Sequence, residues 1–381
     1  GLTSIIIGNG FFKPNISSMV GELYREGDPR RDAGFSLFYS GINIGALLGG
    51  ALCVYLGKSV GWNYAFFAAA VAMFIGIVLF LLTKKSLGPI GNSPLEHMPA
   101  KKRSTREIAV YVGAALSIPL IHAMIVDTQY TDYFMYSIGP VALIYFFYEV
   151  SRMETSAAKK KMFAALLFIV FSIIFFAFFE QSGGSLSLFA KDNLTDNLLF
   201  FTIDPNIVNN ISNAFFVILF APLVGLIWVA LSKKSLEPNT VVKFGMGFLF
   251  LAGSFFILYS TKFFAGPDGI TSLNIFTSAY LIMTLGELCL SPIGLSIMTK
   301  LSPNRLVGMM MGLWFLASAY GQYAAGLLGA NMSSPNVNAS NLEKLNLYTE
   351  GYYQLAIYAL VAGVVLIAIS PIIRKLMQEV K

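Results

Sequence analysis

The sequence predicts an all-α integral membrane protein that consists of two helical lobes with an extra helical hairpin between them. Of its 381 residues, 56% are hydrophobic and only 12% are charged, and the mean hydropathy is +0.68. A soluble domain contains about 25% charged residues. Apolar stretches of about 20 residues, the length of a membrane-spanning helix, recur along the whole chain. The chain is therefore expected to cross the bilayer many times.

The apolar segments are assigned by length, because periodicity does not separate buried helices from lipid-facing ones. After an apolar opening run, we predict ten further segments: Phe35–Leu56, Tyr64–Leu82, Ile108–Val126, Tyr133–Tyr148, Met162–Phe179, Ile211–Leu231, Val241–Tyr259, Leu273–Met298, Leu306–Ala330 and Tyr352–Ile373.

The positive charges are distributed unequally between the two sides of this arrangement. The chain has 26 lysines and arginines and a net charge of +6. Most of them fall in loops on one side, whereas the opposite loops hold only a few, such as Lys191 and Lys262. The positive-inside rule places the basic side and the C-terminus in the cytoplasm, as expected for the inner membrane of a bacterium. The positive charge thus reflects topology and does not predict nucleic-acid binding.

Two polar stretches divide the chain into three parts. Residues 87–106 and 151–161 are rich in charge, and the two apolar segments between them form a predicted hairpin inserted into a linker. We therefore expect the rest of an N-terminal lobe (1–84), a cytoplasmic linker with a transmembrane hairpin (85–161), and a C-terminal lobe of six helices (162–381). Six helices, a linker and six helices is the plan of two-lobed secondary transporters. On that plan, the first three helices of the N-terminal lobe are absent from this sequence.

A lysine ends the apolar opening run. Lys13 is followed by Pro14, which cannot donate a backbone hydrogen bond to Gly10 and so leaves the helix locally polar. One interpretation is a functional cation within the membrane, where a charge costs about 2.5–3.5 kcal/mol on insertion scales. The alternative is a lysine that extends to the cytoplasmic interface.

Two acids and two amides also lie within apolar segments. Glu180 follows a long apolar run, and the helix is expected to continue past it to Ala190. Glu287 lies near the middle of its segment, beside Pro292, which predicts a broken helix around a functional carboxylate. Asn43 and Asn213 can donate and accept hydrogen bonds without a net charge, either to a substrate or between helices.

These polar residues indicate transport rather than catalysis. The sequence has no HExxH, Walker or GxSxG motif and no cluster of Cys and His ligands, so neither an enzyme nor a cofactor is expected. A zwitterionic solute needs an acid at one end, a base at the other and neutral polar groups between them. One cation, two acids and two amides at similar membrane depth provide that set.

Several motifs resemble those of the proton-dependent oligopeptide transporter (POT) family of the major facilitator superfamily. The stretch FYSGINIGAL is similar to the family signature FYxxINxGSL, with Ala46 in place of Ser, and GNGFFKPNISSM is similar to the GxxxKPN signature. FFEQSGGSLSLFA, GELCLSPIGLSIMTKLSP and GMMMGLWFLASAYGQYAAG resemble the seventh, tenth and eleventh helices. The inserted hairpin resembles that of prokaryotic members. The similarity extends over essentially the whole chain.

The resemblance implies roles for the polar residues in the membrane. Lys13 resembles the lysine of the fourth helix, which takes part in proton coupling and pairs with the glutamate of the tenth helix, here Glu287. That glutamate would also bind the free amino group of a peptide. Asn43 and Asn213 match asparagines that hold the peptide.

The same resemblance implies roles for residues near the binding cleft. Trp314 and Ser318 match one wall of the cleft, and Phe176 stands where a tryptophan is common, which affects side-chain preference. Glu180 resembles the glutamate of the seventh helix, whose partner is an arginine on the first helix, and Asp192 would lie at an external gate. The ExxER motif of the first helix does not occur in this sequence.

The sequence thus predicts a monomeric, proton-coupled importer of di- and tripeptides that works by alternating access. A proton on one carboxylate would release the ion pair of Lys13 with Glu287 and so open one side. An importer of nitrate or of another peptide-like solute is the alternative within this class, although a carboxylate in the site favours a substrate with an amino group. A non-transporting sensor on the same fold would be expected to lack the ExxER motif.

Overall fold

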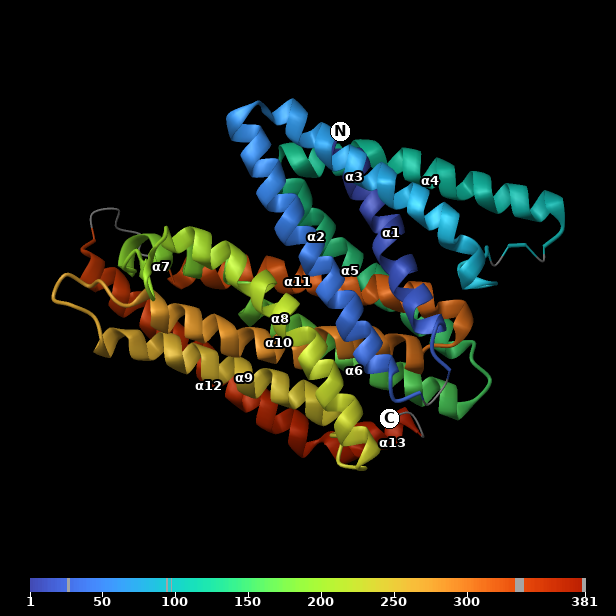
Figure 1. Cartoon of the computed structure of the whole chain (residues 1–381). Helices are drawn as coiled ribbons and strands as arrows, with labels where there is room; N and C mark the ends of the chain where they lie inside the picture. Colours follow the sequence, from blue (N-terminus) through green and yellow to red (C-terminus); the bar gives the residue numbers. More distant parts are fainter. Residues whose placement is uncertain (26–27, 94, 97, 333–338, 379–381) are drawn as a thin grey trace.

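The chain forms an almost entirely helical structure, shown as a computed structural model in Figure 1. The structure describes residues 1–25, 28–93, 95–96, 98–332 and 339–378. Within these residues, nine helices are long and apolar enough to span a membrane. The predicted class, an all-α membrane protein that crosses the bilayer many times, is confirmed.

Many connections between the helices are short, whereas α3 and α4 are separated by residues 84–99. The α-helices are α1 (Leu2–Glu22), α2 (Arg31–Ser59), α3 (Trp62–Thr83), α4 (Ala100–Val126), α5 (Thr128–Ser151), α6 (Ser156–Phe179), α7 (Ser185–Asn193), α8 (Pro205–Lys233), α9 (Thr240–Ser260), α10 (Leu273–Leu301), α11 (Val307–Met332), α12 (Asn341–Ala368) and α13 (Ser370–Met377). Three 3₁₀ turns are η1 (Lys84–Leu87), η2 (Thr261–Phe263) and η3 (Asn304–Leu306), and two short antiparallel strands are β1 (Asn197–Leu198) and β2 (Phe201–Thr202).

Local sequence signals explain where several helices begin. The side chain of Thr155 accepts a hydrogen bond from the backbone of Ala158 at the start of α6, and Asp204 caps α8, whose first residue is a proline. Ser340 and Glu343 form a capping box at the start of α12. These side chains satisfy backbone N–H groups that have no partner within the helix.

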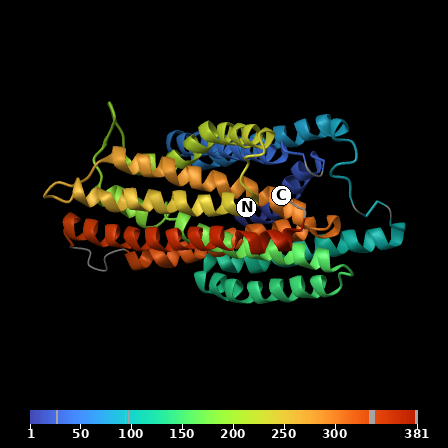
Figure 2. The same ribbon diagram turned by 90° about the horizontal axis from the view of Figure 1, so that it is seen from below.

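The buried core lies among α6 and α8 to α12. In Figure 2, α9, α10 and α12 run side by side, and α9 packs against both of the others. The central helix is α10, in which 83% of an apolar stretch of 18 residues is buried. The corresponding stretches of α3 and α4 are almost fully exposed. Figure 1 shows α3 and α4 along the opposite edge of the molecule from α9 and α12. Helix α2 crosses between these parts and packs on α3, α8 and α10.

Eight of the ten predicted segments fall within one helix each. Leu306–Ala330 begins one residue before α11, and Tyr352–Ile373 continues past the end of α12 into α13. Four further details differ from the prediction. The hairpin connection is the single residue Asp127, which caps α5, because α5 begins at Thr128 rather than near Tyr133. The seventh helix breaks after Phe179 and resumes as α7 at Ser185, so it does not run unbroken to Ala190.

The other two details concern α10 and α11. Helix α10 runs unbroken through Pro292, because the missing hydrogen bond is tolerated in an otherwise regular helix of 29 residues. Helix α11 has 26 residues but is not among the nine helices that meet the length and hydropathy criteria for a span.

Polar contacts attach α5 to α11 and to the turn before it. The Tyr323 hydroxyl on α11 donates to Asp132 on α5 at 2.9 Å, and the Tyr320 hydroxyl donates to the carbonyl oxygen of Met135. At the other end of α5, Arg305 pairs with Glu149 at 2.6 Å. The other helix of the hairpin, α4, packs on α1 and α5 instead. The hairpin therefore touches both the first helix and the C-terminal half of the chain.

Candidate functional site

A buried carboxylate forms the centre of the site. Glu287 lies on α10 with only 3% of its surface exposed. One of its carboxylate oxygens accepts a hydrogen bond from the hydroxyl of Tyr39 on α2, and the other accepts one from Nδ2 of Asn213 on α8 at 2.7 Å. The same amide nitrogen lies 3.3 Å from the hydroxyl of Thr284, one turn earlier on α10. Three helices therefore converge on one acid.

The neutral donors stabilise the carboxylate of Glu287 by hydrogen bonds without neutralising its charge. A buried charge is costly unless it is paired or hydrogen-bonded, and here Tyr39 and Asn213 each donate one hydrogen bond. Neither donor carries a charge that would have to be removed when a cationic group arrives. The arrangement can therefore accept a proton or an ammonium group at Glu287.

Of the two predicted asparagines, only Asn213 contacts Glu287. The side chain of Asn43 donates instead to the carbonyl oxygen of Tyr39, one turn earlier on α2, at 3.0 Å. Asn43 is half-buried and so remains next to the tyrosine that holds the acid. Tyr39, which was not among the predicted site residues, is the tyrosine of the FYSGINIGAL motif.

Lys13 does not pair with Glu287 in this structure, contrary to the ion pair that the resemblance implies. Its ammonium lies 5.9 Å from the ring centroid of Phe315 on α11, and the side chain is exposed. Among the described residues, both oxygens of Glu287 are instead occupied by neutral donors. The structure therefore represents a state in which the acid and the lysine are apart.

Trp314 and Phe176 lie in the packed core. Trp314 is 2% exposed, and its ring fills the space that a side chain at Gly294 would occupy, so the two helices α10 and α11 approach closely. Phe176 is 6% exposed and packs beside Gly321 of α11. Ser318 is half-buried, and its hydroxyl lies 3.4 Å from the carbonyl oxygen of Trp314. Within the described residues, the carboxylate of Glu287 is hydrogen-bonded by Tyr39 and Asn213 rather than by any of these three.

The break between α6 and α7 carries a polar network. Glu180 ends α6 and accepts a hydrogen bond from Gln322 on α11 at 3.3 Å. The next residue, Gln181, is fully buried and donates to the carbonyl oxygens of Ala177 and Ala325 at 3.2 and 3.3 Å. The bond to Ala177 satisfies a carbonyl group in the last turn of α6, and the bond to Ala325 joins the break to α11.

A second chain of hydrogen bonds connects this break to α8 and α10. Asn209 donates to the carbonyl oxygen of Ser182 at 2.9 Å and accepts from the hydroxyl of Tyr280 at 2.6 Å. Asp192, the predicted external gate residue, pairs with Lys344 of α12 at 3.3 Å. That ion pair joins α7 to α12.

A buried charge cluster, which was not predicted from the sequence, joins α2 to α9 and α10. Asp32 is 6% exposed and accepts hydrogen bonds from Lys243, Lys300 and Ser296 at 3.0, 2.8 and 2.6 Å. Lys243 also pairs with Glu237 at 2.5 Å. Lys243 lies in the first turn of α9 and is only 2% exposed. We call these five residues the Asp32 cluster.

The segment that leads into α2 adds further polar contacts beside this cluster. Arg31 donates to the hydroxyl of Thr299 on α10 at 2.7 Å. Arg30 donates to both oxygens of Asp28, and these hydrogen bonds hold the pKa of Asp28 at about 2. Nine residues separate Glu287 from Ser296 on α10, which is about 14 Å along the helix axis. Two polar centres therefore lie at different depths on the same pair of helices.

The comparisons with known proteins agree with this architecture. The chain matches the family profile described as "POT family" over residues 1–345. It is 32% identical to the peptide transporter YePEPT of Yersinia enterocolitica and 31% identical to the dipeptide and tripeptide permease A of Chromobacterium violaceum. Each alignment covers all of this chain and 75% of the relative.

Solved structures show the same fold. A crystal structure of a POT peptide transporter in complex with sulfate covers 97% of this chain and 74% of its own, with a TM-score of 0.68 and 32% identity. A POT family transporter in complex with 5-aminolevulinic acid matches with a TM-score of 0.71 and 27% identity. By sequence and by fold, the chain belongs to the POT family of transporters.

Proposed function

We propose that this protein imports di- and tripeptides together with protons by alternating access. The observation that carries the proposal is the buried carboxylate of Glu287, held by Tyr39 and Asn213 where α2 meets α8 and α10. The names of the relatives, a peptide transporter and dipeptide and tripeptide permeases, support peptides as the substrate class.

The substrate's amino group would bind at Glu287. A peptide ammonium can replace the two neutral donors and form a charge-assisted hydrogen bond, which is about twice as strong as a neutral one. Nitrate has no such group, and its negative charge would be repelled by the carboxylate. This site therefore favours a peptide over nitrate, the alternative substrate.

Protons provide the driving force. Inward movement of one proton releases about 2.3 kcal/mol per 100 mV of membrane potential. A gradient of one pH unit adds about 1.4 kcal/mol. Glu287 and Glu180 are the acids that would carry protons, and Lys13 would approach Glu287 in another state of the cycle. No cofactor other than the proton is needed.

The Asp32 cluster would close the basic side of the protein. It connects α2, which belongs to residues 1–84, with α9 and α10, which belong to residues 162–381. We assign these ranges to two lobes and residues 85–161 to a linker with an inserted hairpin. When the lobes separate on the basic side, Asp32 has to leave both lysines, so the cluster would stabilise the state that is closed there.

On this proposal the basic side faces the cytoplasm of a bacterium, as does the C-terminus, and one molecule transports alone. The charge distribution over the loops supports the orientation. Asp192 would act near the outer side, where it joins α7 to α12.

The test is the uptake of a labelled dipeptide into proteoliposomes that contain the protein. Uptake above the equilibrium level with an inward proton gradient, and its loss without the gradient, is expected. A protein that binds the dipeptide but does not accumulate it under any gradient would be a sensor rather than a transporter.

A further inference from the structure

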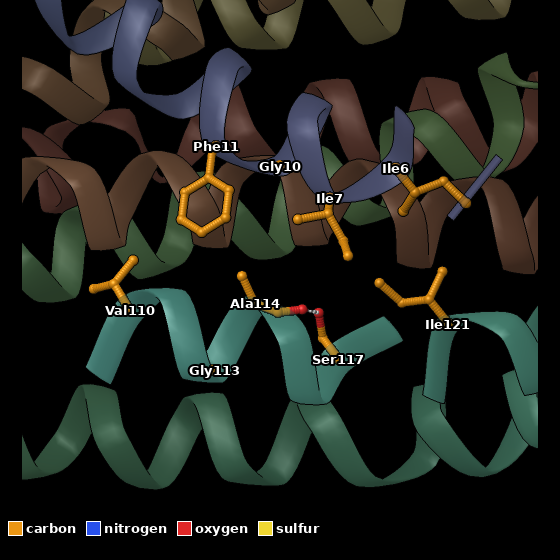
Figure 3. Close-up of a pocket in the computed structure, with 9 residues that line it drawn as sticks. All are labelled: Ile6, Ile7, Gly10, Phe11, Val110, Gly113, Ala114, Ser117 and Ile121. Carbon is orange, nitrogen blue, oxygen red and sulfur yellow. Dashed lines mark hydrogen bonds between the residues drawn. The ribbon is translucent and has the colours of Figure 1, made fainter. Parts of the chain in front are cut away.

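The helices α1 and α4 face each other across an unfilled apolar groove. Its volume is about 550 Å³, and Figure 3 shows side chains of both helices projecting into it. On the α1 side it is lined by Ile6, Ile7 and Phe11, and on the α4 side by Val110 and Ile121. This groove is separate from Glu287 and from the Asp32 cluster.

The groove continues along α4. A second cavity of about 460 Å³ shares Ile6, Ser117 and Ile121 with the first and extends to Ile125. From Val110 to Ile125 the lining covers about 22 Å of helix. Half of a bilayer's hydrocarbon core is about 15 Å thick. The groove is therefore long enough for the whole depth of one leaflet.

The lining offers nothing that would hold water. The hydroxyl of Ser117 donates to the carbonyl oxygen of Ala114 at 2.7 Å, a bond that is drawn in Figure 3. The hydroxyl of Thr131 donates to the carbonyl oxygen of Met124 at 3.1 Å. Both polar side chains are thus satisfied by backbone atoms. An apolar cavity of about 150 Å³ stays dry and binds small hydrocarbons. Inside a membrane, a larger groove of this kind is filled by hydrocarbon.

Positive charge lies at one end of the groove. Arg106 precedes Val110 by four residues and Lys102 by eight, so all three lie on the same face of α4. Arg106 and Lys102 are exposed, whereas the neighbouring Arg103 pairs with Glu107 at 2.8 Å. Basic pockets beside membrane helices bind anionic headgroups, and each basic residue near the surface contributes about 1 kcal/mol.

We propose that the groove between α1 and α4 binds one anionic glycerophospholipid. An acyl chain lies between Phe11 and Val110 and runs on toward Ile121, and the phosphate lies at Arg106 and Lys102. The lipid fills the space that the direct contact between α1 and α4 leaves open, and so joins the inserted hairpin to the first helix. This site does not depend on the identity of the transported substrate.

The probe is phosphatidylglycerol in competition with phosphatidylcholine. The protein is reconstituted in nanodiscs with equal amounts of the two lipids, and the lipid retained after detergent extraction is counted by native mass spectrometry. We expect one retained phosphatidylglycerol per protein. Equal retention of both lipids by the unaltered protein would overturn the proposal, because it would show only the general lipid annulus.

Two variants distinguish binding of the lipid's acyl chain in the groove from binding of its headgroup at the basic residues. Gly113 lines the groove, and a side chain there meets no atom within 4 Å, so Gly113→Leu fills the groove without a clash. We expect about a tenfold loss of retained lipid of either type, which corresponds to about 1.4 kcal/mol. Arg106→Gln should keep a lipid but lose the preference for phosphatidylglycerol.

A matched control tests whether the effect belongs to the groove. Gly76 on α3 is also exposed with no atom within 4 Å of a new side chain, so Gly76→Leu should retain lipid as the unaltered protein does. Ala114→Leu provides a second filling variant, and monodispersity in size-exclusion chromatography reports folding. Normal lipid retention by a folded filling variant, or an unchanged lipid preference in Arg106→Gln, contradicts the proposal.

Discussion

Replacing the buried carboxylate of Asp32 tests directly whether this residue holds α2 against α9 and α10. Asp32→Asn keeps the shape of the side chain and an oxygen for Ser296, but it removes the negative charge between Lys243 and Lys300. The change therefore affects the electrostatic balance of the cluster more than its packing. Lys243 is the residue most affected, because it is 2% exposed.

The expected cost follows from what remains around the two lysines. Removing one partner of a buried ion pair costs about 3–5 kcal/mol, because it leaves a buried charge without compensation. Lys243 keeps Glu237 at 2.5 Å and the ring of Trp228 at 4.8 Å, and Lys300 is 18% exposed on its side chain. We therefore expect a loss near the lower limit, about 3 kcal/mol in the free energy of unfolding.

Reversible unfolding in mixed micelles, followed by circular dichroism, measures this loss. Glu107→Gln is the matched control, because it removes a carboxylate from the exposed pair with Arg103 and should leave the stability unchanged within error. Asp32→Asn combined with Lys243→Met removes both buried charges. The double variant should recover about half of the loss, since an uncompensated charge is no longer buried.

Two results would refute this reasoning. If Asp32→Asn costs no more than Glu107→Gln, the cluster does not hold α2 against α9 and α10. If the double variant is less stable than Asp32→Asn by the full effect of Lys243→Met, the two residues act independently, and their 3.0 Å contact contributes nothing to stability.

Two further predictions concern the residues around Glu287. Tyr39→Phe removes a donor to a buried carboxylate, a hydrogen bond worth about 1.5–3 kcal/mol; the peptide concentration for half-maximal uptake should change at least about tenfold, and an unchanged value in a folded variant would place Tyr39 outside the site. Lys13→Ala should abolish proton-driven accumulation and leave peptide counterflow partly intact, whereas two unchanged activities would identify Lys13 as an interfacial lysine that is not part of coupling.

The helical architecture could be predicted because the bilayer makes it a matter of local sequence. Every backbone group must be satisfied within the membrane, so a long apolar run such as Met162–Phe179 can only form a helix. Helix caps are local as well, since Ser340 and Glu343 act within one turn. The break after Phe179 was missed because it depends on Gln181 bonding to α11, a contact between distant segments.

The candidate site was predictable only in part. Glu287 and Asn213 stood out because a polar side chain within an apolar run needs an explanation. Tyr39 did not, since tyrosine is common in such helices and its hydroxyl reveals a role only when the acid lies opposite. Lys243 was similarly hidden, because its burial depends on Asp32, which lies far away in the sequence.

The measurement that tests the central claim most directly is proton-driven dipeptide uptake by Glu287→Gln in proteoliposomes. The substitution preserves the side-chain shape, and the amide can still accept a hydrogen bond from Asn213 and donate one to the hydroxyl oxygen of Tyr39, so the variant should fold. Glu350→Gln, on the exposed end of an ion pair with Lys262, is the control and should transport normally. We predict that Glu287→Gln accumulates no dipeptide under an inward proton gradient. Accumulation at the rate of the unaltered protein would contradict the assignment of Glu287 as the residue that couples substrate and proton.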